Sequence, residues 1–151
     1  MTETTSYIKK GNIFYVELGT ERNGSIQNGG ATGVRPCIVM SNKIACDVSP
    51  VLLVVPITSS YGKHRKSMPT HLELGNILPK KSVALFEQVL TVNRYQLRDK
   101  ISNLSEDLLE EANKKIMISF GLVPQYAWNQ KIGRFNWKRP IFFVACFHIK
   151  K

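Results

Sequence analysis

Arg35 is the residue whose type and place most directly suggest phosphate chemistry. It stands in the stretch GVRPCIVMSN, between a segment rich in Gly, Asn and Ser (23–33) and an aliphatic run. That order predicts a guanidinium at the junction of a loop and a strand. A guanidinium offers several planar N–H donors that match phosphate oxygens, although an arginine before a strand can equally be a surface ion-pair partner.

Basic and histidine side chains form a second group of candidates. The run KHRK (63–66) follows a predicted strand end, where it could steer a phosphate backbone or form a solvated loop. Histidine suits acid–base work near neutral pH. His71 lies within a predicted strand, which favours a structural role, and we expect His64 and His148 to be exposed to solvent. We therefore do not assign the chemistry to a histidine.

The first two thirds of the chain carry short β-rich runs separated by clusters of Gly, Asn, Pro and Ser. The predicted strands are Ile13–Leu18, Cys37–Met40, Val51–Ile57, His71–Leu74 and Val83–Val89. This patterning is typical of a β-barrel or sandwich. The run VLLVVPI is continuously apolar, which predicts a strand covered on both faces. Pro56 within it has no N–H and predicts a bulge or a strand end.

After these strands the hydrophobic period becomes helical. Ser105 is a good N-cap, and Gly121 followed by Pro124 is a stop signal, so one long helix is predicted between them. Its apolar positions recur at helical spacing, which predicts one face packed on the sheet. These positions are Leu108, Leu109, Ala112, Ile116 and Phe120. A shorter helical turn is predicted at Arg94–Leu97.

Composition limits the class of protein. The 151 residues fit one domain, and 43% hydrophobic with 21% charged residues is typical of a folded globular chain, not of a disordered or membrane-spanning one. The first residues lack the apolar run of a secretory signal, so we expect a cytoplasmic protein. Three cysteines, Cys37, Cys46 and Cys146, show no metal-ligand spacing, and we interpret them as reduced thiols.

The formal net charge of +10 favours an acidic partner such as nucleic acid. Six of the basic residues and none of the acids lie in the C-terminal segment, residues 123–151, which leaves +4 on residues 1–122. The C-terminal segment also contains both tryptophans and an uncharged apolar stretch, Ile141–Phe147. We interpret that stretch as an extra strand or an oligomer contact, and the basic aromatic residues before it as a possible extension of an RNA surface.

Several motifs occur in a fixed order: KGNIFYVEL, GVRPCIVMSN, VLLVVPITSS, MPTHLEL, SVALFEQVLTVNRYQL and KISNLSEDLLEEANKKIMISFGL. Together they resemble the MazF/PemK toxin family. The resemblance runs from about Lys10 to Leu122 and leaves out the C-terminal segment. It therefore divides the chain into a MazF/PemK-like ribonuclease domain, residues 1–122, and a basic aromatic extension, residues 123–151.

The resemblance implies both a fold and an activity. The implied fold is an α+β protein, mainly β, with an SH3-like small β-barrel of the PemK/MazF/CcdB type and a C-terminal helix. The implied activity is that of a type II toxin–antitoxin toxin, a metal-independent endoribonuclease that cuts single-stranded mRNA at specific sequences. Such a protein needs no cofactor or metal, works as a homodimer, is neutralised by an acidic antitoxin and does not involve a membrane.

The same resemblance implies the site residues. Matched position by position, the catalytic residues fall on Arg35 and Thr58. The implied substrate-binding residues are Ser25, Gln27, Ser59, Lys63, Arg65 and Gln88. Ile26 stands where some family members carry a glutamate, so no carboxylate base is expected there. Phe14 and Tyr61 are further candidates for stacking on RNA bases.

Two other functions remain open on the sequence alone. The same barrel could belong to a CcdB-like toxin that binds a protein target such as gyrase without catalysis, because a fold does not determine a function. The chain could also be an inactive RNA-binding relative. Cleavage of a long single-stranded RNA in excess EDTA would separate the enzyme from both alternatives.

Overall fold

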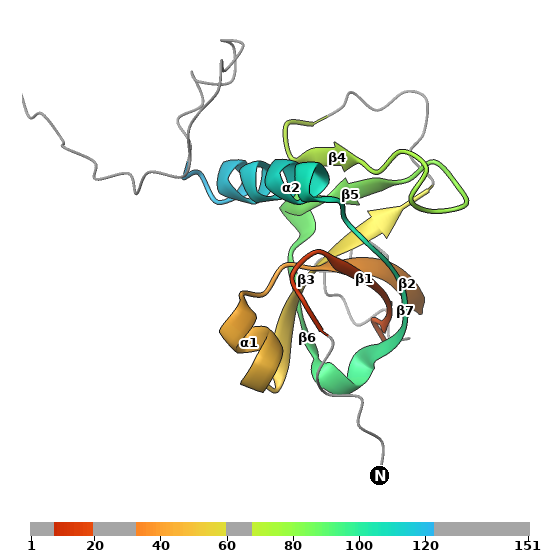
Figure 1. Ribbon diagram of the computed structural model, residues 1–151, viewed down its shortest axis with the longest axis vertical. Coiled ribbons are helices and arrows are strands. Elements are labelled where there is room, and N and C mark those ends of the chain that lie inside the picture. Colours follow the sequence, from red (N-terminus) through yellow and green to blue (C-terminus); the bar gives the residue numbers. More distant parts are fainter. Residues whose placement is uncertain (1–7, 20–32, 60–67, 123–151) are drawn as a thin grey trace, which may run out of the picture.

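The computed structural model describes residues 8–19, 33–59 and 68–122 and shows an antiparallel sheet with one long helix packed against it (Figure 1). The strands are β1 (Asn12–Glu17), β2 (Val34–Val39), β3 (Val51–Thr58), β4 (His71–Glu73), β5 (Val83–Leu85), β6 (Leu90–Asn93) and β7 (Leu97–Asn103). The helices are α1 (Lys43–Val48) and α2 (Glu106–Ser119), with short 3-10 turns η2 (Phe86–Gln88) and η3 (Arg94–Gln96). The expected barrel-like α+β fold with a C-terminal helix is confirmed.

The sheet has the strand order β4-β5-β3-β2-β1-β7, and β6 pairs with β3 beside this path. Apolar residues on its two faces form two separate cores. One core includes Ile38 and Val55 and lies beneath α2 and the β4–β5 hairpin, and the other includes Cys37 and Val54 on the opposite face. Side chains alternate between the faces of a strand, so β2 and β3 must be apolar on both. The prediction that VLLVVPI is covered on both faces is therefore confirmed.

Pro56 lies inside β3, so the expected bulge or strand end is wrong. It is paired with Cys37 of β2 on one side. On the other side β6 pairs with β3 up to Val54, and β5 begins to pair at Ile57. Pro56 thus falls between the two strands that pair with this edge of β3. A backbone N–H at this position would have no strand partner, so the lack of an N–H in proline costs no hydrogen bond.

Helix α2 matches its prediction closely. Ser105 is the N-cap, and its hydroxyl accepts a hydrogen bond from the Leu108 N–H at 3.4 Å. Gly121 ends the helix with φ +67°, a conformation that favours glycine. Ala112 is fully buried against the core beneath the helix. Phe120 was expected on this packing face, but it is 59% exposed because it is the C-cap residue, beyond the regular helical turns.

Helix α1 was not predicted. Its N-cap is Asn42, whose side chain accepts a hydrogen bond from the Ala45 N–H at 2.9 Å. At its other end Arg94 of η3 binds the carbonyls that the helix leaves open. Its Nη2 donates to the carbonyl oxygens of Ala45, Cys46 and Ser49 at 3.2, 2.7 and 2.9 Å. A helix of six residues is thereby held by an arginine distant in the sequence.

The remaining differences concern strand ends. The strand predicted over Val83–Val89 stops at Leu85, where η2 begins. The helical turn predicted at Arg94–Leu97 is the 3-10 turn η3. Strands β6 and β7 were not predicted. The C-terminal segment lies outside the described residues, so its expected packing stays a prediction.

Candidate active site

Arg35 and Thr58 lie at matching ends of two neighbouring strands. Arg35 is the second residue of β2 and is exposed, whereas Thr58 ends β3 and is half-buried. The two strands are antiparallel, and the last registered pair at this end is Cys37 with Pro56. Continuing that register by two residues places Arg35 opposite Thr58. Residues opposite one another in an antiparallel pair leave the sheet on the same face, so the two side chains share a face.

No pairing of β2 with β3 is registered beyond Cys37 and Pro56, and Pro36 gives a physical reason. The Met40 N–H donates to the Leu53 carbonyl at 2.9 Å, and hydrogen-bonded pairs alternate along antiparallel strands. By this alternation Pro36 and Ile57 should exchange two N–H···O bonds. Pro36 has no N–H, so that pair cannot form in full. At this end β3 also pairs with β5, through Ile57 and Thr58.

The start of β2 is fixed against β1. The Leu18 N–H donates to the Gly33 carbonyl at 3.0 Å, and the Gly33 N–H donates to the Gly19 carbonyl at 2.9 Å. Gly33 has φ +82°, which a residue with a side chain rarely adopts. Arg35 itself is paired with Val16 of β1. The backbone that carries the guanidinium is therefore held on one side by a full ladder.

The other expected substrate-binding residues are distributed unevenly. Ser59 is exposed and directly follows Thr58. Gln88 ends η2 and is half-buried. Val83 pairs with Thr58 and Leu90 pairs with Val54, so Gln88 lies along the flank of β3, not at its end. The four remaining candidates lie outside the described residues: Ser25, Gln27, Lys63 and Arg65.

Phe14 cannot stack on RNA in this fold. It is 8% exposed and belongs to the core that contains Cys37. Its neighbour Tyr15 is 44% exposed, because successive residues of a strand point to opposite faces. Tyr61, the second stacking candidate, lies outside the described residues.

A hydrogen-bonded cluster beside η2 was not foreseen as a unit. The Glu87 carboxylate accepts from the Thr70 hydroxyl at 2.7 Å and lies 2.9 Å from the His71 Nε2. The Met68 N–H donates to the His71 Nδ1 at 3.2 Å, which assigns the ring hydrogen to Nε2. Burial raises the pKa of Glu87, but the hydrogen bonds from Thr70, from its own backbone N–H and from His71 outweigh burial and leave this pKa lowered.

The cluster makes His71 a structural residue, as its strand position predicted. The ring is buried, and each of its nitrogens faces a partner. Through Glu87 it ties the start of β4 to the turn that carries Gln88. Sequence spacing gave no sign of this contact, because sixteen positions separate His71 from Glu87.

Cys37, two residues from Arg35, is not a nucleophile. Its side chain is fully buried in the core opposite α2, and burial raises the pKa of the thiol to about 12, against the smaller opposing effect of Arg35. Thiolates are the reactive form of cysteine, so this thiol is inert in the folded protein. Cys46 is also buried, which agrees with the interpretation of both residues as unreactive thiols.

Metal-binding clusters and membrane-spanning helices are absent from the described ranges. No cluster of three or more His, Cys, Asp or Glu side chains there could hold a metal ion. Neither of the two helices described has the length and apolar character to cross a membrane. The chemistry that the candidate site offers comes from two hydrogen-bond donors, a guanidinium and a hydroxyl, at the matching ends of β2 and β3.

Comparison with known proteins identifies the family of the chain. Residues 9–120 match the family model of the PemK-like, MazF-like toxins of type II toxin–antitoxin systems. Endoribonuclease EndoA of Bacillus subtilis (strain 168) is 31% identical over 119 residues, which cover 77% of this chain and 97% of that protein.

Solved structures of similar proteins show the same fold. An endoribonuclease in complex with its cognate antitoxin from a mycobacterial species has a TM-score of 0.62 at 17% identity, covering 77% of this chain and 97% of its own. MazF (Form-I) from Deinococcus radiodurans has a TM-score of 0.59 at 19% identity, covering 76% and 96%. On the family match and the identity to EndoA, this chain belongs to the PemK-like, MazF-like toxin family of type II toxin–antitoxin systems.

Proposed function

We propose that this chain is an endoribonuclease toxin that cuts single-stranded mRNA at specific sequences, with Arg35 and Thr58 as its catalytic residues. The observation that supports the proposal is that Arg35 of β2 and Thr58 of β3 both lie just beyond the last registered pair of these strands, Cys37 with Pro56. A scissile phosphate bound there meets two donors from one face. The name of the relative EndoA supports the choice of RNA as the substrate.

The chemistry follows from the donors. The ribose 2′-oxygen gives its proton to water and bonds to the adjacent phosphorus, negative charge develops on the phosphoryl oxygens, and the bond from phosphorus to the 5′-oxygen breaks as that oxygen takes a proton from water. The products are a 2′,3′-cyclic phosphate and a 5′-hydroxyl. A guanidinium keeps its proton at all working pH values, so Arg35 acts by stabilising charge and not by transferring a proton. Thr58 adds a second donor to the same oxygens. No metal ion takes part in this scheme.

The substrate strand approaches from the same end of the sheet. Residues 20–32 join the end of β1 to the start of β2, and residues 60–67 follow Ser59, so both segments start beside the catalytic pair. We place Ser25, Gln27, Lys63 and Arg65 on the substrate for this reason, with the basic residues neutralising phosphates. Ser59 contacts the strand next to the cut. Gln88, farther along β3, reads a base away from the scissile bond.

The chain works with protein partners as well as RNA. We propose a homodimer that a small acidic antitoxin neutralises, because solved relatives include complexes with a cognate antitoxin. The net charge of +10 fits an acidic partner. We place the protein in the cytoplasm, where mRNA is found and where buried thiols such as Cys37 and Cys46 stay reduced.

The test is cleavage of a long single-stranded RNA by the purified full-length protein in excess EDTA. We expect discrete fragments whose 3′ ends carry a cyclic phosphate and whose 5′ ends are free hydroxyls. Arg35→Ala, purified in parallel, controls for a contaminating nuclease and should leave the RNA intact. Intact RNA with the wild-type protein would overturn the proposal and favour a toxin that binds a protein target, and equal cleavage by both proteins would reject the assignment of Arg35.

A further inference from the structure

Turn η2 joins the β4–β5 hairpin to β6 and ends at Gln88. Its first residue, Phe86, is fixed from three directions. The Phe86 side chain is fully buried in the core beneath α2. The Phe86 N–H donates to the Thr70 carbonyl at 3.2 Å, and the Phe86 carbonyl accepts from the Ser119 hydroxyl of α2 at 2.8 Å. The start of the turn is therefore anchored both to the chain before β4 and to α2.

The second residue of the turn, Glu87, is fixed through its side chain. One carboxylate oxygen accepts from the Thr70 hydroxyl at 2.7 Å, and the other lies 2.9 Å from the His71 Nε2. Thr70 and His71 are buried, whereas the Glu87 carboxylate is 28% exposed. A turn of three residues is weakly held by its own backbone, and η2 has no side-chain cap. The two donors therefore orient the residue that directly precedes Gln88.

Gln88 is available to a ligand at the end of this turn. It is half-buried, and its side-chain amide forms no hydrogen bond with another residue of the described ranges. An amide carries a donor and an acceptor, which suits the edge of a base. Turn η2 directly follows β5, and β5 pairs with β3 through Ile57 and Thr58. A base that Gln88 reads is thus held at a set offset from a phosphate at Thr58.

The His71 ring joins a second substrate-binding segment to the same turn. Its Nδ1 accepts from the Met68 N–H at 3.2 Å. Met68 is the first described residue after the segment that contains Lys63 and Arg65. The ring therefore connects the end of that basic segment with η2 through Glu87.

An acidic side chain next to an RNA contact needs a physical reason. Phosphates repel a carboxylate, so Glu87 beside Gln88 weakens the attraction of RNA to this surface. The two hydrogen bonds supply the reason. They use both oxygens of the carboxylate to fix the backbone that leads to Gln88.

We propose that Glu87, held by Thr70 and His71, is a positioning residue for base specificity: it sets the orientation of η2 and thereby aims the Gln88 amide. Glu87 acts through Gln88 and does not touch the reacting atoms. The inference rests on the proposed function, because it requires cleavage of RNA at specific sequences. It adds a group of side chains behind the RNA surface that determines how strictly one base is read.

The test measures base discrimination in full-length variants. Product ends from the wild-type protein give the cleavage sequence, and Gln88→Ala shows at which position selectivity is lost. Discrimination at that position is the ratio of kcat/KM for the preferred base to kcat/KM for the other bases, measured on short oligonucleotides. Melting temperatures are recorded for every variant.

We expect Gln88→Ala to lower this ratio about tenfold, the weight of one hydrogen bond. Glu87→Ala should lower it to a similar extent at the same position, and the double variant should lower it no further, because both changes act through one amide. The loss should lie in KM, with kcat on the preferred sequence within about twofold of wild type, since this base lies away from the cut.

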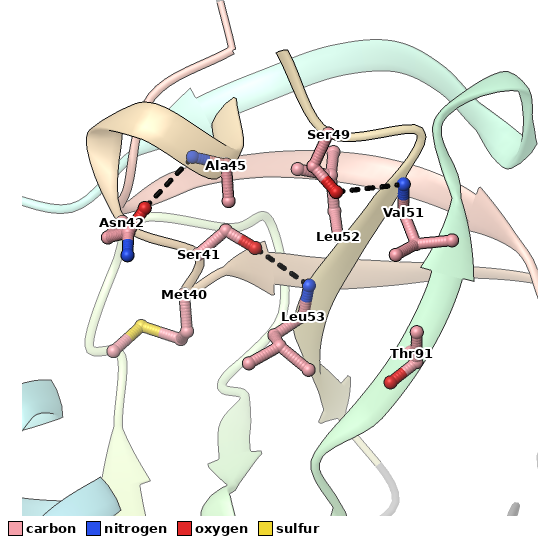
Figure 2. Close-up of a pocket in the computed structure, with 9 residues that line it drawn as sticks. All are labelled: Met40, Ser41, Asn42, Ala45, Ser49, Val51, Leu52, Leu53 and Thr91. Carbon is pink, nitrogen blue, oxygen red and sulfur yellow. Dashed lines mark hydrogen bonds between the residues drawn. The ribbon is translucent and has the colours of Figure 1, made fainter. Parts of the chain in front are cut away.

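Two further substitutions separate positioning from general stability. Thr70→Val removes the hydroxyl donor and should lower the same ratio, whereas Thr70→Ser keeps the donor and should retain it. Asn42→Ala is the control for stability. It removes the hydrogen bond from the Ala45 N–H that caps α1 near the start of β3, shown in Figure 2, and should lower the melting temperature without changing the ratio.

The outcomes distinguish this inference from the proposed function. Wild-type discrimination in Glu87→Ala or in Gln88→Ala, with RNA still cut, would overturn the positioning role and leave the nuclease assignment standing. Loss of selectivity at every position, or an equal loss in Asn42→Ala, would also overturn it, because the fold as a whole would then be loosened. If Glu87→Ala does not fold, the two variants of Thr70 decide in the same way. No cleavage by the wild-type protein would reject both proposals.

Discussion

Each end of the β2–β3 pair carries an arginine, and the two arginines differ in their surroundings. At the α1 end, Arg94 donates to the carbonyls of Ala45, Cys46 and Ser49, so its guanidinium holds the main chain together. At the other end, Arg35 is exposed and lies beyond the last registered pair of β2 with β3. One arginine is committed to the fold, and the other faces the region where a substrate would lie. Charge alone does not distinguish them, but the surrounding backbone does.

The largest effect that follows from this contrast is on catalysis. Arg35→Ala should lower the cleavage rate about 10²-fold to 10³-fold or below detection, because it removes a preorganised donor to the developing charge, and it should leave the melting temperature nearly unchanged. Single-turnover cleavage and thermal unfolding measure the two quantities. Arg98→Ala, which removes an exposed arginine paired with Glu17, serves as the matched control and should keep the activity. Loss of activity together with unfolding would contradict the assignment.

A second prediction separates the hydroxyl of Thr58 from its shape. Thr58→Val keeps the volume and should slow cleavage about tenfold to a hundredfold, the value of one hydrogen bond to a charged group. Thr58→Ser keeps the hydroxyl and should retain most of the rate. Cleavage under single-turnover conditions gives both values, and equal rates for the valine and serine variants would show that the hydroxyl takes no part.

At the α1 end the expected effect is on stability. Arg94→Ala should lower the free energy of unfolding by about 2 kcal/mol or more, because several carbonyl oxygens lose a charged donor at once. Urea unfolding measures the loss. Arg98→Ala should cost no more than about 1 kcal/mol, as expected of an exposed ion pair. Equal losses of unfolding free energy for the two variants would show that the hydrogen bonds from Arg94 to α1 stabilise the fold no more than an exposed ion pair does.

The smallest predicted effect concerns Glu87 and acid. Its pKa is lowered in the folded chain, so ionised Glu87 adds stability above the ordinary carboxyl pKa, and this contribution disappears as the pH falls through the folded value. Glu87→Gln should therefore be less stable than wild type at neutral pH by about 1 kcal/mol and should lose less stability below about pH 4.

Urea unfolding at several pH values tests the Glu87 prediction. The control is Glu73→Gln, which removes an exposed carboxylate of β4 and shows whether the loss of any carboxylate gives the same curve. A Glu87→Gln curve parallel to wild type at every pH would show that the cluster with Thr70 and His71 is not coupled to ionisation.

The parts of the fold that were predictable have strong local signals. Strand β3 is a run of apolar residues, and α2 has a serine N-cap, a helical apolar period and a glycine stop. Helix α1 was missed because six residues carry too little periodicity. Strand β7 was missed because LRDKISN is a mostly polar strand without alternation. Long-range pairing with β1, not local propensity, makes it a strand.

Long-range contacts also limited what the sequence could predict about the candidate site. Arg35 and Thr58 were assigned through ordered motifs, and the structure places them at matching ends of β2 and β3, while their roles stay a prediction. One stacking candidate was wrong, since Phe14 is buried in the core with Cys37, and a single sequence does not show which face of β1 is covered. The contact between His71 and Glu87 joins distant positions and has no signature that a single sequence could reveal.

We propose that RNA binds at the end of β2 and β3 that carries Arg35 and Thr58. Hydrogen–deuterium exchange tests this most directly. The probe is an oligonucleotide with the cleavage sequence read from the product ends and a 2′-deoxy nucleotide at the cut, so that it binds without reacting. We predict slower exchange in residues 34–36 and 57–59 on binding, with no change in α1. Protection confined to α1 and β6, with none near Arg35 and Thr58, would contradict the account.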